Sequence, residues 1–199
     1  MRVPRLPDLV VLLLALCLAT FAQAAGFDLQ ALMQQLAQVH AGVANFVEDR
    51  QVAQLDQPMR SSGRLSFSAP DTFERETLRP RPERLAVVGN QLTITRGDRT
   101  RTALLDSVPE AAVIVEAVRG TLTGNAVTLQ RLFDTTVKGS PDNWQLDLLP
   151  REARMRAQVA SIRVTGRGAE VREVRITMAD GDTSVMHIEP VPGAPAARP

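Results

Sequence analysis

The chain has almost no cysteine, histidine, lysine or tyrosine. Among its 199 residues there are one cysteine (Cys17), two histidines and no tyrosine, and Lys138 is the only lysine. Cys17 lies in an apolar run near the N-terminus that predicts a cleaved segment, so the rest of the chain has no residue for a disulfide or a thiolate site. His40 and His187 lack the spacing of a metal-binding motif. We therefore expect no metal and no cofactor.

Residues 1–24 have the features of a secretory signal peptide. Arg2 and Arg5 precede an unbroken apolar run over 9–18, and the Ala-Gln-Ala of 22–24 has the small residues of a signal-peptidase site. The run is well short of the roughly 20 residues that span a bilayer. The sequence therefore predicts an exported, periplasmic protein, with an uncleaved anchor as the alternative.

Charge is balanced along the chain. There are 23 basic and 22 acidic residues, and removing residues 1–24 leaves equal numbers of the two. A neutral protein of this kind is not expected to bind nucleic acid or a strongly anionic surface. The remaining length favours one domain over 25–190, and the Pro/Ala-rich residues 191–199 are expected to form a disordered tail.

The stretch 61–78 organises the predicted fold. Polar and apolar residues alternate over 63–69, which is typical of a strand with one buried face. Pro70 removes a ladder donor, so the strand must end or bend there before a second strand begins at Thr72. The result is a pair of strands that meet at a proline corner.

Helical and strand patterns fill the rest of the chain. Asp28 is placed to cap a first helix that Gly42 ends, and residues 107–110 read as a capping box for a second helix over 111–118 that Gly120 ends. A shorter helix is expected over about 127–133. Roughly ten strands are expected, over 43–55, 61–69, 72–79, 84–88, 91–96, 99–105, 144–148, 162–164, 174–178 and 183–189. This predicts an α+β fold in which a strongly curved antiparallel sheet wraps three helices.

No pattern in the sequence supports catalysis. Glu74 and Glu76 share a strand face, as the carboxylates of a hydrolase can, but a solvated charged rim is the commoner explanation. No serine lies in a Gly-x-Ser-x-Gly motif. We predict that the protein is not an enzyme. The curved sheet leaves two alternatives for its interior, an apolar cavity or an ordinary filled core, and composition alone favours the second.

Several segments carry a resemblance to a known family. They are the signal-like N-terminus, the amphipathic first helix, Ala44-Asn45-Phe46, Gly63-Arg64-Leu65-Ser66-Phe67 followed by Pro70 and Phe73, the helix after Ser107, Leu132-Phe133, and Trp144-Gln145-Leu146-Asp147-Leu148-Leu149-Pro150. On these residues the chain resembles the outer-membrane lipoprotein carriers of the LolA type, and in particular their divergent members. The resemblance spans essentially the whole chain after the signal-like segment.

The resemblance implies a half-open β-barrel whose mouth is covered by helices that act as a lid. It implies a periplasmic monomer that binds acyl chains of a lipoprotein or other lipid without catalysis, receives them from an inner-membrane donor and passes them to an outer-membrane acceptor. Gly63, Pro70 and Phe73 match the family's strand-corner motif, with Phe73 facing the lipid. The expected ligand-binding residues are Leu65, Phe67, Phe73, Val87, Leu92, Ile94, Val113, Ile114, Val115, Val118, Trp144 and Leu146.

The chain departs from the family pattern at two positions. Ala69 stands where family carriers have an arginine that latches the lid, and Arg75 stands where they usually have tryptophan. Arg64 and Arg75 are candidates for a replacement latch on charge alone. Two other functions remain open, an accessory subunit of an envelope export complex that carries nothing, and a hydrolase of an acylated substrate.

Overall fold

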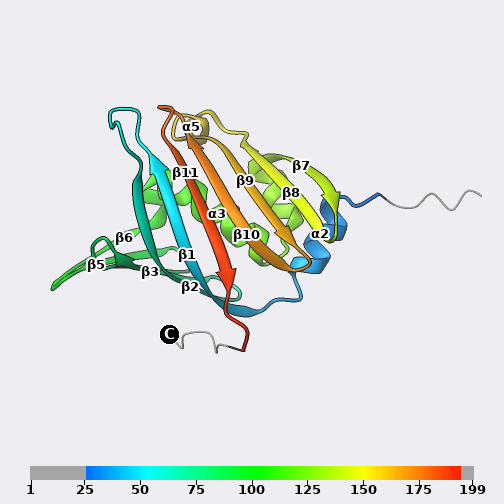
Figure 1. Cartoon of the computed structure of the whole chain (residues 1–199). Helices are drawn as coiled ribbons and strands as arrows, with labels where there is room; N and C mark the ends of the chain where they lie inside the picture. Colours follow the sequence, from blue (N-terminus) through cyan, green and yellow to red (C-terminus); the bar gives the residue numbers. More distant parts are fainter. Residues whose placement is uncertain (1–25, 194–199) are drawn as a thin grey trace, which may run out of the picture.

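The computed structural model describes residues 26–193, and the predicted signal segment and residues 194–199 lie outside this range. The described chain forms one open antiparallel sheet of 11 strands in the order β6-β5-β4-β3-β2-β1-β11-β10-β9-β8-β7 (Figure 1). The strands are β1 (Ala41–Gln51), β2 (Met59–Ser68), β3 (Thr72–Arg79), β4 (Glu83–Val88), β5 (Gln91–Arg96), β6 (Arg99–Leu104), β7 (Phe133–Ser140), β8 (Asn143–Pro150), β9 (Val159–Arg167), β10 (Glu170–Met178) and β11 (Thr183–Pro190).

The helices lie together on one side of the sheet (Figure 1). They are α2 (Leu29–Leu36), α3 (Pro109–Leu122), α4 (Ala126–Leu132) and α5 (Ala153–Arg156), with a 3-10 turn at Leu105–Ser107 before α3. The chain builds one half of the sheet from β1 to β6, crosses to the opposite edge through α3 and α4, and returns through β7 to β11, which pairs with β1. This crossing places α3 and α4 over the hollow of the curved sheet. The predicted α+β, half-open barrel is therefore confirmed.

None of the helices among the described residues is both long enough and apolar enough to cross a membrane.

Turn chemistry explains the predicted hairpins. Gly89 has φ +56° between β4 and β5, and Gly97 has φ +57° between β5 and β6. Glycine reaches these left-handed conformations without the steric cost that a side chain imposes. Asp28 caps α2 as predicted, because its Oδ1 accepts a hydrogen bond of 2.9 Å from the Ala31 N–H.

Two predicted helix ends are wrong. Gly42 lies inside β1, and α2 already ends at Leu36. Gly120 lies inside α3, which continues to Leu122. A Cβ at Gly120 would come within 2.7 Å of Leu129 Cδ2 in α4. The glycine thus allows α4 to pack closely against α3 and does not end the helix.

The predicted capping box is also wrong, and two short elements were missed. Ser107 Oγ donates to the carbonyl of Leu104, and Val108 occupies the N-cap without a side-chain bond. The missed elements are β7, whose mostly polar residues hide the strand pattern, and the four-residue α5.

Two separate apolar clusters fill the space between the sheet and the helices. The first packs α2, α3, α4 and α5 onto β7–β10, and its buried residues are Leu32, Met33, Leu36, Val113, Ala117, Leu129, Phe133, Trp144, Leu146, Leu148, Met155, Val159, Ile162 and Val164. The second lies between the first half of α3 and β3–β5, and only Val87, Leu92 and Leu105 are fully buried there. The core is therefore dense at one end of the sheet and thin at the other.

Gly63 allows a close approach inside the curved part of the sheet. It lies opposite Phe46 of β1, and a Cβ at this position would collide with the Glu76 carbonyl and lie 3.0 Å from Phe46 Cε1. Gly63→Ala is expected to lower the free energy of unfolding by roughly 1–3 kcal/mol, because the backbone of β3 must shift to admit the methyl group. The shift in the urea midpoint measures this loss.

Gly42→Ala is the matched control for Gly63→Ala. Gly42 lies in β1, and no heavy atom is within 4 Å of a Cβ built at this residue. Its urea midpoint is expected to stay within about 0.5 kcal/mol of the parent protein. Equal destabilisation by both substitutions would show that the close contact at Gly63 has no special cost.

Candidate functional site

Two rows of apolar side chains cross the concave face of β2–β5. The register pairs Phe67 with Phe73, Phe73 with Val87, and Val87 with Leu92. The stacked rings of Phe67 and Phe73 have centroids 5.1 Å apart and an interplanar angle of 24°. Residues two positions along form the second row, which contains Leu65, Arg75, Leu85 and Ile94. We call these eight residues the apolar wall, although Arg75 is charged.

The first half of α3 faces the apolar wall with small side chains. Val108, Ala111, Ala112 and Val115 pack on the second cluster together with Phe73, Leu85 and Ile94 of the sheet. All seven remain partly exposed, because small residues on the helix do not cover the wall completely. Apolar surface that is only half covered is where a ligand can add contacts.

The structure divides the predicted ligand-binding set between the two clusters. Leu65, Phe67, Phe73, Val87, Leu92 and Ile94 lie on the apolar wall, and Val115 faces it. Val113, Ile114, Trp144 and Leu146 belong to the first cluster, where the Trp144 side chain is also fixed by a 2.8 Å hydrogen bond to the Gly168 carbonyl. Val118 is half-buried and lies in neither cluster.

A charged network that the sequence did not reveal lies beside the wall. Arg75 Nη2 donates to Glu48 Oε2 at 2.5 Å and to Ser61 Oγ at 3.2 Å. Ser61 Oγ donates to Glu48 Oε2 at 3.1 Å, and Ser184 Oγ donates to Oε1 at 2.5 Å. The Arg75 guanidinium carbon lies 4.7 Å from the centre of the Phe46 ring, a cation–π contact. In the sequence, one signal shows that Glu48 faces inward. It lies two positions after Phe46 on β1, so the two side chains share a face of the strand.

These surroundings lower the pKa of Glu48. Burial alone would raise the pKa, but the charge of Arg75 and the hydrogen bonds from Ser184, Arg75 and Ser61 outweigh it. A carboxyl group whose pKa is lower in the folded state stabilises the fold above its ordinary pKa of 4.5, and the stability is lost as the pH falls below that value toward the folded pKa.

Glu48→Gln should therefore change how stability depends on pH. The parent protein is expected to lose free energy of unfolding as the pH falls below about 4.5, and the variant is expected to lose less over the same range. Urea unfolding at a series of pH values between neutral and acidic measures both slopes. Parallel slopes would contradict the assignment of this acid-linked stability to Glu48.

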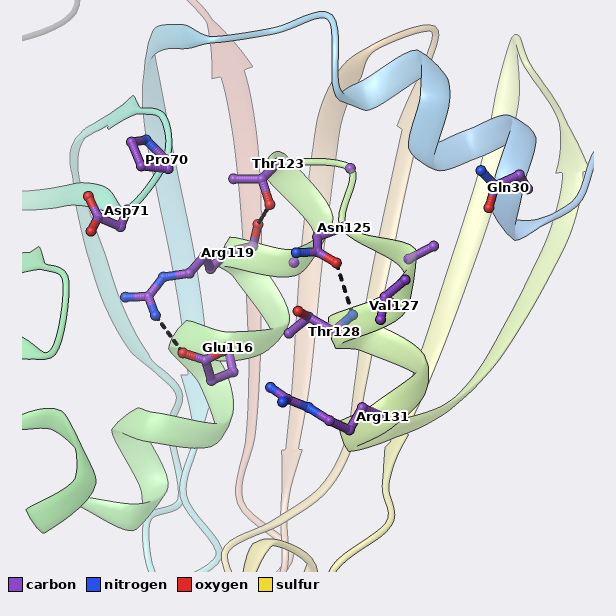
Figure 2. A pocket seen from close by; sticks show the side chains of 13 residues that line it. Gln30, Pro70, Asp71, Glu116, Arg119, Thr123, Asn125, Val127, Thr128 and Arg131 are labelled. Atoms are coloured by element: carbon purple, nitrogen blue, oxygen red, sulfur yellow. Dashed lines mark hydrogen bonds and ion pairs between the residues drawn. The ribbon is translucent and has the colours of Figure 1, made fainter.

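A different arginine joins the helix to the sheet. Arg119 of α3 donates from Nη2 to the Gly89 carbonyl in the β4–β5 turn at 2.6 Å. Its Nη1 donates to Glu116 at 2.6 Å (Figure 2). Of the two replacement latches considered from sequence, Arg75 binds Glu48 and Arg64 is exposed on β2. No sequence pattern pointed to Arg119, since its partner is a backbone carbonyl.

A cleft of about 610 Å³ lies outside the apolar wall, between the β2–β3 corner, α2, α3 and α4 (Figure 2). Eight of its 13 lining residues are polar or charged, and none of the predicted ligand-binding residues contributes to it. The lining residues are Gln30, Pro70, Asp71, Glu116, Arg119, Gly120, Thr123, Gly124, Asn125, Ala126, Val127, Thr128 and Arg131. The two rows of apolar side chains lie on the half-covered apolar wall, so we place the candidate lipid site there.

The chain is similar to several solved structures at low sequence identity. Similar solved structures include a LolA superfamily protein from Nitrosomonas europaea (7% identity, 84% of this chain and 95% of that chain, TM-score 0.45). A DUF1329 family protein from Desulfovibrio piger matches at 10% identity (86% and 94%, TM-score 0.47). A putative outer membrane lipoprotein-sorting protein domain from Vibrio parahaemolyticus matches at 11% identity (82% and 91%, TM-score 0.42).

A search of curated proteins returned no match. A family model, in contrast, matches residues 21–194 and carries the description "Outer membrane lipoprotein carrier protein LolA-like". This match covers most of the chain and confirms the resemblance seen in the sequence. The chain therefore belongs to the LolA-like family of outer membrane lipoprotein carrier proteins.

Proposed function

We propose that this protein binds the acyl chains of a lipoprotein or another lipid against the apolar wall and carries them across the periplasm without catalysis. The observation that carries the proposal is the half-covered second cluster, where the partly exposed Phe73, Leu85 and Ile94 face the first half of α3. Family membership and the predicted signal peptide support the compartment. An inner-membrane donor and an outer-membrane acceptor are part of the same proposal.

The size of the hydrophobic effect makes a movable helix necessary. Each buried methylene contributes about 0.8 kcal/mol, so an acyl chain of a dozen carbons offers on the order of 10 kcal/mol before ordering and desolvation costs. Release from such a site is slow unless the protein replaces the lost contacts. When α3 returns to the wall, its apolar side chains take the place of the acyl chain, which gives the two alternative states that loading and release require.

The polar groups near the wall suit binding better than catalysis. A carboxylate with a lowered pKa is a weak general base, and the Ser61 and Ser184 hydroxyls both donate to Glu48. His187, which lies on β11, is 61% exposed at its side chain and pairs with Glu173. Glu74 is held by two hydrogen bonds to Arg84, as expected for a charged outer face.

Mass spectrometry of lipids that copurify with the protein tests the proposal. The protein is purified from the periplasm of its own host under mild conditions, with the Phe73→Glu variant prepared in parallel. We expect an acylated species with the parent protein and much less of it with the variant. If both preparations contain the same lipids, or neither contains any, carriage on the apolar wall is not supported.

A further inference from the structure

We propose that Arg75 binds an oxygen acceptor, a carboxylate or ester carbonyl, at the polar end of the acyl ligand. This inference rests on the proposed function and names the part of the ligand that the wall recognises. It assigns a role to the one charged residue of an otherwise apolar surface.

The position of Arg75 on the wall is the first argument. The register places it directly between Leu65 of β2 and Leu85 of β4, and Phe73 is its neighbour on the same face of β3. A guanidinium among apolar side chains is costly unless its hydrogen bonds are satisfied. The guanidinium in the second row therefore offers N–H donors to the polar end of an acyl chain that lies along the wall.

The hydrogen bonds of the network are the second argument. Both carboxylate oxygens of Glu48 have hydrogen-bond donors, since Oε1 accepts from Ser184 and Oε2 accepts from Ser61 and Arg75. Arg75 donates only through Nη2, and its Nε is buried without a hydrogen-bond partner among residues 26–193. The guanidinium has five N–H donors, so the network has more donors than acceptors. The group that it can still bind is a hydrogen-bond acceptor.

The remaining contacts orient the guanidinium toward a ligand. The Phe46 ring covers one face of the guanidinium at 4.7 Å, and Glu48 holds Nη2, so the side chain is fixed on two sides. The Arg75 side chain is still 30% exposed, against 13% for Glu48. An incoming group therefore meets the arginine more readily than the carboxylate. The expected preference is for a carboxylate, which makes a charge-assisted hydrogen bond, over a neutral hydroxyl, with a cationic head group bound most weakly.

Three amphiphiles with the same chain test this selectivity. Dodecanoate, 1-dodecanol and dodecylammonium are titrated at pH 8 by displacement of a fluorescent fatty acid. The two ionic amphiphiles are kept below their micellar concentrations and dodecanol below its solubility limit. A charge-assisted hydrogen bond favours dodecanoate over dodecanol by about tenfold or more, and dodecylammonium should be the weakest ligand. In the paired variant Glu48→Gln/Arg75→Leu, which removes both charges together, the preference for dodecanoate should fall to about twofold or less.

The outcomes separate this inference from the proposed function. Equal affinities for dodecanoate and dodecanol in the parent protein overturn the role of Arg75 but leave acyl binding intact. A preference for dodecanoate that persists in the paired variant also overturns the role of Arg75 and leaves acyl binding intact. Tight binding of dodecylammonium has the same meaning. Failure of all three amphiphiles to bind overturns the proposed function and this inference with it.

Discussion

Phe73→Glu is expected to lower the affinity for a fluorescent fatty acid by at least about 100-fold. Phe73 stacks on Phe67 at 5.1 Å and pairs with Val87 in the middle of the wall. A carboxylate at this position must be desolvated before an acyl chain can lie over it, which costs several kcal/mol, and about 2.7 kcal/mol already corresponds to 100-fold. Equilibrium titration followed by fluorescence measures the change.

Leu78→Glu is the matched control for Phe73→Glu. Leu78 lies on the same strand, β3, at an irregularity in its pairing with β2, and is 48% exposed. The control should bind the fatty acid with an affinity within a factor of two of the parent, and circular dichroism should show both variants folded. If Phe73→Glu is folded and still retains the fatty acid, the ligand does not lie on the apolar wall.

Arg75→Leu is expected to lower the free energy of unfolding by about 3 kcal/mol. The substitution leaves the Glu48 carboxylate half-buried without its cation, and breaking a buried ion pair from one side costs roughly 3–5 kcal/mol. We expect the lower end of this range because the Arg75 side chain keeps some exposure. Urea unfolding at neutral pH measures the loss.

The paired variant Glu48→Gln/Arg75→Leu should recover most of that stability. With both charges removed, no uncompensated charge is left beside the wall. Arg64→Leu, at an exposed position on β2, should change stability by less than about 0.5 kcal/mol and serves as the control. If the single and paired variants are equally unstable, the loss comes from packing of the arginine and not from the unpaired carboxylate.

Local patterns in the sequence predicted the hairpins of the sheet well. The strand over 72–79, the strand over 91–96 and the turns at Gly89 and Gly97 all depend on neighbouring residues. Alternation and turn chemistry act over a few positions, so they can be read without knowing the tertiary fold.

The charged network depends on contacts between distant residues. Glu48 lies 27 positions from Arg75 and 136 positions from Ser184 in the sequence. From the sequence, Arg75 is a candidate latch for the lid on charge alone. Its inward orientation follows from the strand period, which places it on the face of Phe73, but the acid that compensates it can be found only from the register of β1, β2 and β3.

The path of α3 divided the predicted ligand-binding set. The helix was predicted as one apolar segment, yet Val113 and Val115 pack on different clusters because α3 crosses between two parts of a curved sheet. Trp144 and Leu146 alternate as ligand-facing residues do, but α2, α3 and α4 fill the space over them. Alternation identifies the inner face of a strand and says nothing about which helix covers it.

Isotope-filtered NMR on the protein with bound palmitate tests the central claim most directly. With methyl groups labelled, the account predicts intermolecular contacts from the acyl chain to Leu85 and Ile94 of the wall and to Val115 of α3. Contacts to the first cluster at Leu148 and Val164, or to Val127 of the cleft beside α4, would contradict it.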